Sequence, residues 1–182
     1  ATDTSKSSLD RSQSHWFQLA RSITGVRILD PRVDGEFGGT SAFTVIAPLR
    51  SPNGQFLGAI AAVVGVPSVM QILDDTMQVL KNVEWTDASH LEYQLLNEKG
   101  NLIGDSTQRE EDRLDLKPVE YPSATLVRKQ ERGFIQETHL RHGTSLITAY
   151  AQVNIAYADP PLRWGILIHV DRDSLLTPIH SF

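Results

Sequence analysis

The chain has 182 residues, enough for one ordinary domain or two small ones, and its 40% hydrophobic and 21% charged content is typical of a globular protein. Its 17 basic and 22 acidic residues give a net charge of −5 with no run of Lys or Arg, which argues against a nucleic-acid partner and against binding to an anionic membrane surface. The chain has no cysteine, which excludes thiolate catalysis, disulfides and the usual structural zinc sites.

The first half of the chain predicts a helix, a loop, a hairpin and a second helix. Apolar residues recur at helical spacing over residues 9–23, and turn-forming Asp, Gly and Pro crowd residues 30–39, which we expect to form a loop. Apolar stretches over residues 40–48 and 56–66 flank a Pro-Asn-Gly turn and predict a β-hairpin. A proline then opens an amphipathic helix over residues 67–80. The longest apolar run, 56–66, is far shorter than the roughly 18 residues that a membrane-spanning helix needs.

The second half predicts five strands, with helical material between the second and the third. A turn over residues 97–100 joins the first two strands, and the densely charged stretch 107–116 is typical of a solvated helix or loop. The expected elements are strands over residues 91–96, 102–104, 134–140, 145–153 and 163–170, and a helix over residues 124–131. A hairpin, a helical crossover and a three-stranded meander in this order predict an α+β domain of PAS type.

One strand–turn–strand unit occurs twice in the chain. The first copy covers residues 40–66 and leads into the amphipathic stretch 67–80, and the second covers residues 145–170 and leads into the stretch 171–179. The segment 83–90 separates the two halves as a link. The repeated unit carries no reactive side chain, which favours a pocket-bearing scaffold over an enzyme.

The order and spacing of these segments resemble the extracytoplasmic double Cache sensors of bacterial membrane receptors, which carry two PAS-like units, distal and proximal to the membrane. The stretches that carry the resemblance are Asp10-Arg11, His15-Trp16-Phe17, Ala20, Ile28-Leu29-Asp30-Pro31 through Asp34, and residues 43–49, 53–54, 57–66, 93–106, 164–170 and 171–176. The resemblance implies an α+β fold of PAS-like antiparallel sheets flanked by helices. Residues 1–82 would form a partial distal unit, and residues 83–182 a complete proximal unit of about five strands.

Two departures from the family's pattern bear on function. The family's long N-terminal helix and first distal strands are absent, so we expect the chain to be a fragment of such a domain. Amino-acid-binding members carry an Arg two places before the helix Trp and an Asp in the strand that ends the distal unit, and the matching positions here are Ser14 and Val63. The resemblance therefore argues against amino-acid recognition.

The candidate ligand-binding residues are aromatic or charged side chains on the expected helices, strands and loop. A flat aromatic beside a guanidinium, as on the first helix, suits an organic anion, although a core Trp and a surface Arg explain the same pattern. Two tyrosines and a tryptophan on the proximal strands line its expected cavity or simply pack in its core. The full set is Trp16, Phe17, Arg21, Asp30, Asp34, Tyr93, Tyr150 and Trp164.

Three further patterns each have a structural and a functional interpretation. His139 and His142 form an HxxH pair, but on a strand end we expect them to face solvent rather than to bind metal. Carboxylates at positions 30, 34 and 36 among glycines suit calcium, yet turn chemistry explains them better. His169 lies in an apolar strand, either as a pH-sensitive group or as a hydrogen-bonded structural histidine. We expect no metal and no cofactor.

The sequence thus favours a ligand-sensing domain of a bacterial transmembrane receptor (histidine kinase, chemoreceptor or diguanylate cyclase), with no catalytic residue of its own. We expect it to be the periplasmic part of an inner-membrane protein, linked to the membrane only through flanking helices. It would bind a small organic molecule, act as a homodimer in the full receptor and signal through its C-terminal segment. The alternatives are a PAS-like dimerisation or protein-interaction module without small ligand and, more remotely, a metal-assisted hydrolase built on His139 and His142.

Overall fold

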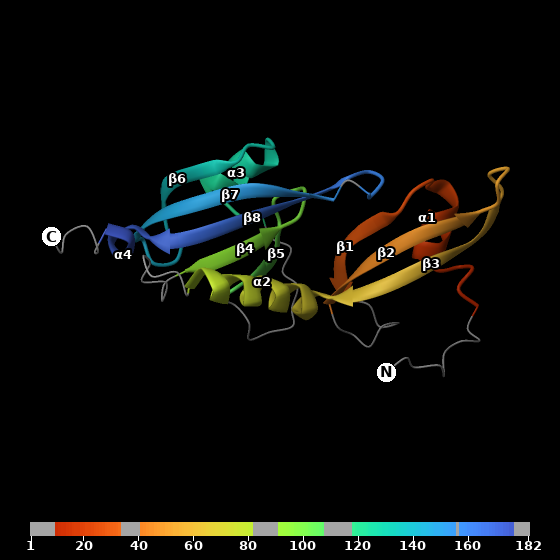
Figure 1. Cartoon of the computed structure of the whole chain (residues 1–182), viewed down its shortest axis with the longest axis horizontal. Helices are drawn as coiled ribbons and strands as arrows, with labels where there is room; N and C mark the ends of the chain where they lie inside the picture. Colours follow the sequence, from red (N-terminus) through yellow and green to blue (C-terminus); the bar gives the residue numbers. More distant parts are fainter. Residues whose placement is uncertain (1–9, 34–40, 82–90, 108–117, 156, 177–182) are drawn as a thin grey trace.

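Two antiparallel sheets lie end to end along the long axis of the molecule (Figure 1). The computed structural model describes residues 10–33, 41–81, 91–107, 118–155 and 157–176. The smaller sheet has the strand order β1-β2-β3 and the larger one the order β5-β4-β8-β7-β6. The α+β fold class that the sequence predicts is therefore confirmed.

The described residues up to Lys81 are called the first unit here, and those from residue 91 onward the second unit. The first unit consists of one helix, three strands and a long second helix. Its elements are α1 (His15–Ser22), β1 (Arg27–Val33), β2 (Ser41–Arg50), β3 (Phe56–Gly65) and α2 (Val66–Lys81). The second unit contains β4 (Glu92–Leu96), β5 (Leu102–Asp105), α3 (Pro122–Arg128), β6 (Gly133–Thr138), β7 (Ser145–Ile155), β8 (Leu162–Asp171) and α4 (Arg172–Leu176). The five predicted strands with a helix between the second and the third are all present.

The predicted repeat is also confirmed. The hairpin β2–β3 runs directly into α2, and the hairpin β7–β8 runs directly into α4, with no residue between strand and helix. Of the predicted amphipathic stretch 171–179, residues 172–176 are helical and residues 177–179 lie outside the described part. The predicted link 83–90 lies wholly outside the described part, as does almost all of the charged stretch 107–116.

One prediction for the first half is wrong, and another is too long. Residues 30–33, expected in a loop, belong to strand β1, which pairs antiparallel with β2. The ladder shifts register between Leu29 and Arg32, so a bulge accommodates Pro31, which has no N–H to donate. Helix α1 begins at His15 rather than at residue 9, because residues 11–14 form a turn in which Ser14 N donates to Arg11 O over 2.9 Å.

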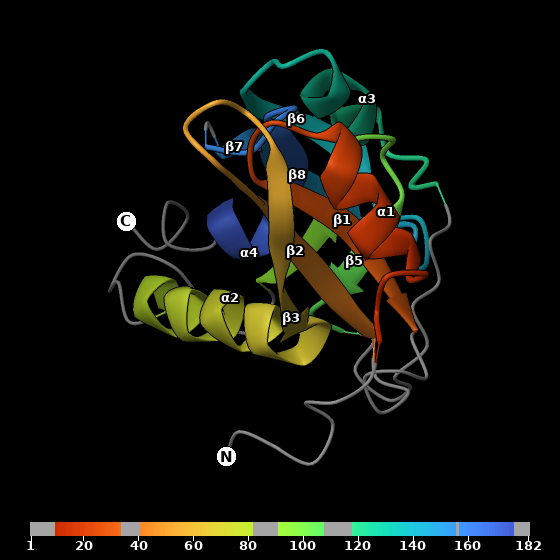
Figure 2. The ribbon, with the colours of Figure 1, turned by 90° about the vertical axis from the view of Figure 1, so that its right-hand side faces the viewer.

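The helices cover different faces of the sheets, as Figures 1 and 2 show. Helix α1 packs against β2 and β3 of the smaller sheet, around a core of Trp16, Ala20, Ile23 and Ile46. In the larger sheet, Leu95 packs toward α2 and the next residue, Leu96, toward α3. Successive strand residues point to opposite faces, so α2 and α3 cover opposite faces of this sheet.

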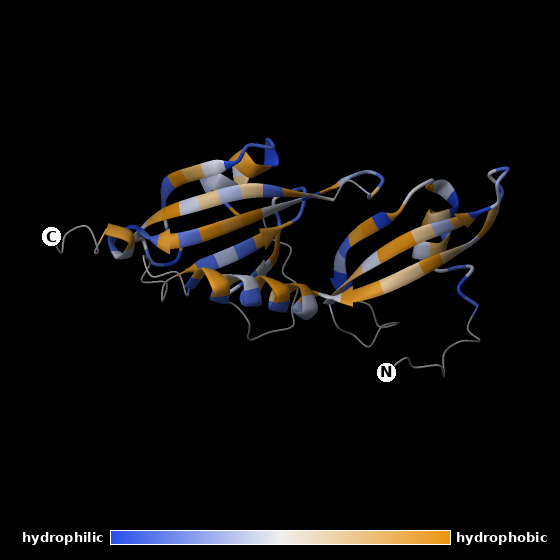
Figure 3. Cartoon of the chain, in the orientation of Figure 1, coloured by the Kyte–Doolittle hydropathy of each residue, from blue (hydrophilic) through white to orange (hydrophobic). Residues whose placement is uncertain are grey.

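A single hydrophobic cluster joins the two sheets. Phe43 of β2 lies against Trp164 of β8 with ring centroids 4.6 Å apart, and side chains of α2 surround them. Helix α2 starts at the end of β3, runs along the larger sheet and carries alternating orange and blue segments in Figure 3, and its Val66, Val69, Met70 and Leu73 belong to this cluster. Burial of aromatic surface is the main favourable term in such packing, so the cluster fixes the sheets to each other.

No helix of the described residues has the length and apolar character needed to cross a bilayer.

Candidate functional site

The residues predicted to bind ligand on the first helix form an aromatic cluster with the smaller sheet. The rings of Trp16 and Phe17 meet edge to face at 5.6 Å, and Phe17 meets Phe56 of β3 in the same way at 5.7 Å. Trp16 is buried, and its indole Nε1 has no hydrogen-bond partner among the described residues. A buried N–H without an acceptor costs about 1–3 kcal/mol, and an acceptor atom brought by a ligand would remove this cost.

Two arginines flank this aromatic cluster. The guanidinium carbon of Arg21 lies 5.6 Å from the ring centre of Phe17 and 5.8 Å from that of Phe56. The guanidinium carbon of Arg50 lies 5.7 Å from the ring centre of Phe56. Arg50 Nη2 also donates to the carbonyls of Arg21 and Ile23 at 2.8 and 2.9 Å, which caps the end of α1. Sequence reasoning missed Arg50, whose only signal was its place at the hairpin turn.

Two other candidates, Asp30 and Tyr93, lie at the junction of the units. Asp30 Oδ2 accepts a hydrogen bond from Asn97 Nδ2 at 3.0 Å, which joins β1 to the β4–β5 turn. Tyr93 is buried, and its hydroxyl contacts Met70 O at 3.1 Å and Asp74 Oδ1 at 2.7 Å, both on α2. These contacts tie α2 and β1 to the larger sheet.

The remaining candidates do not join the α1 cluster. Trp164 lies in the core shared by the two sheets, and its Nε1 has no hydrogen-bond partner among the described residues. Tyr150 packs beside the α3 core, close to Gly133. Asp34, with Glu36 of the calcium hypothesis, lies outside the described residues. The structure therefore distributes the candidates over three places, and their role in ligand binding stays a prediction.

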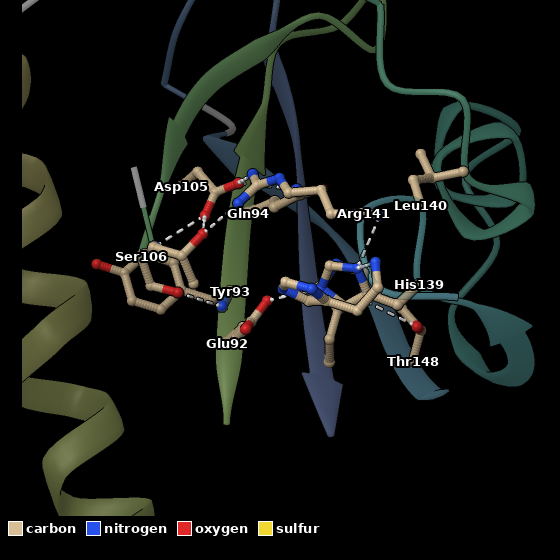
Figure 4. A network of polar contacts seen from close by, with 12 residues as sticks. Glu92, Tyr93, Gln94, Asp105, Ser106, His139, Leu140, Arg141 and Thr148 are labelled. Atoms are coloured by element: carbon tan, nitrogen blue, oxygen red, sulfur yellow. Dashed lines mark hydrogen bonds and ion pairs between the residues drawn. The ribbon is translucent and has the colours of Figure 1, made fainter. Parts of the chain in front are cut away.

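A polar network on the α3 side of the larger sheet went unrecognised in the sequence (Figure 4). It is centred on Asp105 of β5, which is buried. Asp105 Oδ1 accepts from the N–H and hydroxyl of Thr107 at 2.8 and 2.7 Å, and Oδ2 accepts from Gln94 Nε2 at 3.0 Å and Arg141 Nη2 at 2.7 Å. Burial opposes ionisation of Asp105, but the hydrogen bonds from Thr107 and Gln94 and the Arg141 guanidinium outweigh it and lower the pKa of Asp105.

His139 holds the turn that carries Arg141. Its Nδ1 accepts hydrogen bonds from the backbone N–H groups of Arg141 and His142 at 3.1 and 3.3 Å, and its Nε2 lies 3.3 Å from Glu92 Oε2. Because Nδ1 accepts, the ring proton sits on Nε2 and points at Glu92. The expectation that His139 faces solvent is wrong, since the turn folds over it and buries it.

The HxxH pair does not form a metal centre in the described part of the chain. The rings of His139 and His142 stack with centroids 4.5 Å apart, and both nitrogens of His139 are engaged. No group of three or more His, Cys, Asp or Glu side chains among the described residues has a metal-binding arrangement. The network instead fixes the β6–β7 turn over the sheet.

A buried carboxylate and a buried imidazole complete the network. Glu137 accepts from Ser123 N at 3.1 Å and from its hydroxyl at 2.8 Å, so it caps the first turn of α3. His169 Nδ1 lies 2.8 Å from Thr148 Oγ1 and 3.9 Å from Glu137 Oε1, while Nε2 has no hydrogen-bond partner among the described residues. Burial lowers the pKa of His169, although the nearby carboxylates of Glu137 and Glu92 oppose this shift.

Tyr121 closes this region from the α3 side. Its ring lies 4.8 Å from that of His169, and its hydroxyl accepts a hydrogen bond from Leu140 N at 3.1 Å. Burial raises the pKa of Tyr121, so its hydroxyl stays protonated over the physiological range. The hypothesis of a hydrogen-bonded structural His169 fits this geometry at Nδ1, while Nε2 has no hydrogen-bond partner among the described residues.

No protein-family model matches the sequence, and no curated protein sequence matches it. Solved structures do match in fold. The periplasmic sensory domain of the Campylobacter jejuni chemoreceptor Tlp1 superposes with a TM-score of 0.65 at 16% identity, over 92% of this chain and 58% of that chain. The ligand-binding domain of the Pseudomonas fluorescens chemoreceptor CtaA, in complex with L-alanine, gives 0.58 at 18% identity, over 92% and 64%.

The extracellular domain rpHK1S-Z16, assigned to a histidine kinase, gives a TM-score of 0.56 at 16% identity, over 93% of this chain and 64% of that one. The chain therefore spans about three fifths of the length of these similar structures. The fold is that of the extracytoplasmic sensory domains of bacterial receptors, as the resemblance to double Cache sensors predicts.

Proposed function

We propose that this chain is the ligand-sensing part of a bacterial transmembrane receptor, placed outside the cytoplasmic membrane. The observation that carries the proposal is the fold match of 92% of this chain to the periplasmic sensory domain of Tlp1, with a TM-score of 0.65. The output would be a histidine kinase, a chemotaxis signalling domain or a diguanylate cyclase, in a homodimeric receptor anchored by helices that flank this domain. We propose no catalytic role for the chain itself.

The α1 cluster is the place we propose for the ligand. The unpartnered Trp16 Nε1 offers a hydrogen-bond donor, and Arg21 offers positive charge beside the Phe17 ring. These groups suit a small organic molecule with an acceptor or anionic group. Ser14 is half-exposed before α1 and makes no side-chain cap, and Val63 is apolar, so neither provides the charge of the amino-acid clamp.

A continuous path leads from this cluster to the C-terminal end. Strand β3 packs under α1 and continues directly into α2, which Tyr93 ties to β4 through Asp74. Strand β4 pairs with β8, and β8 continues directly into α4. We propose that ligand binding shifts the population of α1–β3 packings and that α2, β4 and β8 pass this shift to α4. In this proposal Asp30, Tyr93 and Trp164 serve transmission, and Tyr150 remains a proximal candidate.

A thermal-shift screen of small acids, amines and purines tests the proposal, because a ligand that binds only the folded state raises Tm. We expect at least one compound to raise Tm, and Trp16→Phe, which keeps the ring but removes the N–H, to abolish most of that rise. Trp164→Phe is the matched control, since its Nε1 is also buried without a partner. No rise across the panel, or a rise equally sensitive to both variants, would contradict the proposal.

An interaction module without small ligand is the second candidate, and one observation favours it. Among the described residues β3 pairs only with β2, and it presents an uncharged ten-residue edge with exposed Leu57, Ile60 and Val64. Such an edge is prone to pair with another strand. If it does, Ile60→Lys will suppress concentration-dependent association in sedimentation velocity, and Val79→Lys on the exposed face of α2 will not. Equal effects of both variants would exclude a specific role of the edge.

A further inference from the structure

Three carboxylates lie in the network under the β6–β7 turn. Carboxylates of Glu92, Asp105 and Glu137 come from three different strands of the larger sheet, and Asp105 and Glu137 are almost fully buried. The positive charge that contacts Asp105 comes from Arg141, and the donor facing Glu92 is His139 Nε2. Carboxylates are stable in a protein interior only where cations and N–H donors surround them.

Two buried atoms of the same network lack a partner among the described residues. The side-chain nitrogen of Gln94 is used by Asp105, which leaves its Oε1 without a donor. The Nε2 of His169 has no partner either, and His169 is only 2% exposed. Glu92 pairs with His169 and Gln94 with Leu167, so alternation along the strands puts Glu92, Gln94 and His169 on one face. An additional N–H donor placed here would satisfy Gln94 Oε1, an acceptor that is otherwise costly to bury.

The β6–β7 turn carries Arg141, whose guanidinium is the cation that contacts Asp105. Arg141 is 38% exposed, while the carboxylate it contacts is 3% exposed. The turn itself is solvent-facing, since Leu140, His142 and Gly143 are all exposed. A guanidinium thus enters from a surface turn to neutralise a carboxylate that the sheet itself buries. The same contact is open to any small cation with N–H donors, provided that Arg141 moves away.

We propose that this cluster (Glu92, Gln94, Asp105, Glu137 and His169) is a second binding site, specific for the ammonium or guanidinium group of a small organic cation. The cation replaces the Arg141 guanidinium at Asp105, donates to Gln94 Oε1, and lifts the His139–Thr144 turn from the sheet. This site lies in the other unit from the α1 cluster and does not depend on a ligand there.

Isothermal titration calorimetry of the whole chain with methylammonium and methylguanidinium chloride tests the site. Tetramethylammonium chloride has the same charge but no N–H, and therefore controls for ionic strength and for charge alone. We expect saturable binding of at least one of the first two cations and none of tetramethylammonium. The absence of saturable binding for both N–H cations, or equal binding of tetramethylammonium, overturns the proposal.

Variants separate this site from adventitious binding. Glu92→Gln, at a carboxylate that is about a third exposed, and Asp105→Asn each remove one charge, and we expect affinity to fall by about tenfold or more in both. Glu131→Gln, at an exposed carboxylate, is the matched control and keeps wild-type affinity. Arg141→Gln removes the competing cation and strengthens binding, while Arg132→Gln at an exposed site does not. If Asp105→Asn fails to fold, Glu92→Gln still decides, and unchanged affinity in that variant overturns the proposal.

The test is independent of the proposed function. Trp16→Phe leaves cation binding at this cluster unchanged, whereas Glu92→Gln leaves binding at the α1 cluster unchanged. Loss of cation binding in Trp16→Phe would show that the cation binds elsewhere and overturn the second site. A failed ligand screen with intact, Glu92-dependent cation binding contradicts only the α1 site.

Discussion

Phe43 and Trp164, 121 positions apart in the sequence, pack with ring centroids 4.6 Å apart and ring planes tilted by 38°, in a core that both sheets share. A domain pair joined only by a linker moves freely, but a shared aromatic core couples the units energetically. The signalling path proposed above would use this contact to carry a change at the first sheet to the second.

Phe43→Ala tests the coupling. Truncating this buried ring is expected to cost about 3–5 kcal/mol of unfolding free energy and to destabilise both units together. Urea unfolding followed by tryptophan fluorescence and by far-UV circular dichroism measures this. Phe134→Ala, at a side chain that is 78% exposed, is the control and is expected to cost no more than about 0.5 kcal/mol. Two separate transitions in the wild-type protein would contradict a shared core.

Tyr93→Phe tests the tie between α2 and the larger sheet. It removes the hydroxyl that contacts Asp74 Oδ1 and Met70 O but keeps the buried ring. Losing this hydrogen bond is expected to cost about 0.5–1.5 kcal/mol and to speed amide hydrogen exchange in α2. Tyr157→Phe, at a fully exposed ring, is the control. Unchanged exchange in α2 would show that Tyr93 does not restrain this helix.

Gly165→Ala tests the packing of α3 on β8. An added Cβ would lie 2.8 Å from Val127 Cγ1 and 3.5 Å from Leu96 Cβ, so α3 would have to move away. We expect a loss of about 1–3 kcal/mol in stability, measured by urea unfolding. Gly58→Ala in β3 is the matched control, because nothing lies within 4 Å of its added Cβ. Equal stability of the two variants would contradict tight packing at Gly165.

The depressed pKa of His169 predicts a pH dependence of stability. Its ordinary value is 6.5, and burial lowers it in the folded state. Well above pH 6.5 the imidazole is neutral in both states. As the pH falls through 6.5, this imidazole binds a proton in the unfolded chain but stays neutral in the folded chain. The free energy of unfolding therefore falls with pH, by at most ~1.4 kcal/mol per pH unit.

His169→Asn is expected to reduce this slope while keeping a polar partner for Thr148. Unfolding free energies at pH 7.5, 6.5 and 5.5 for both proteins measure the difference. The lowered pKa of Asp105 adds a separate loss, which begins only near and below its ordinary value of 3.8, because its protonation removes native contacts. A variant slope equal to that of the wild type above pH 5.5 would contradict a role of His169.

The sequence by itself determined the two hairpin–helix repeats and the five strands of the larger sheet, with a helix between the second and the third. Alternation and apolar runs decide which residues form β2, β3, β7 and β8, and a proline at the second residue of α2 marks its start. These signals are local, since each depends on neighbours within a few positions. The PAS-like fold class follows from their order.

Only the tertiary structure decided where the chemistry lies. Asp30 and Pro31 favour a turn, but residues 30–33 belong to β1 because they pair with β2, with a bulge for Pro31. The contact of Arg141 with Asp105 joins residues 36 positions apart, and the tautomer of His139 depends on backbone groups that the turn brings to it. Burial and pairing across strands are properties of the folded chain, so the spacing of residues in the sequence does not predict these contacts.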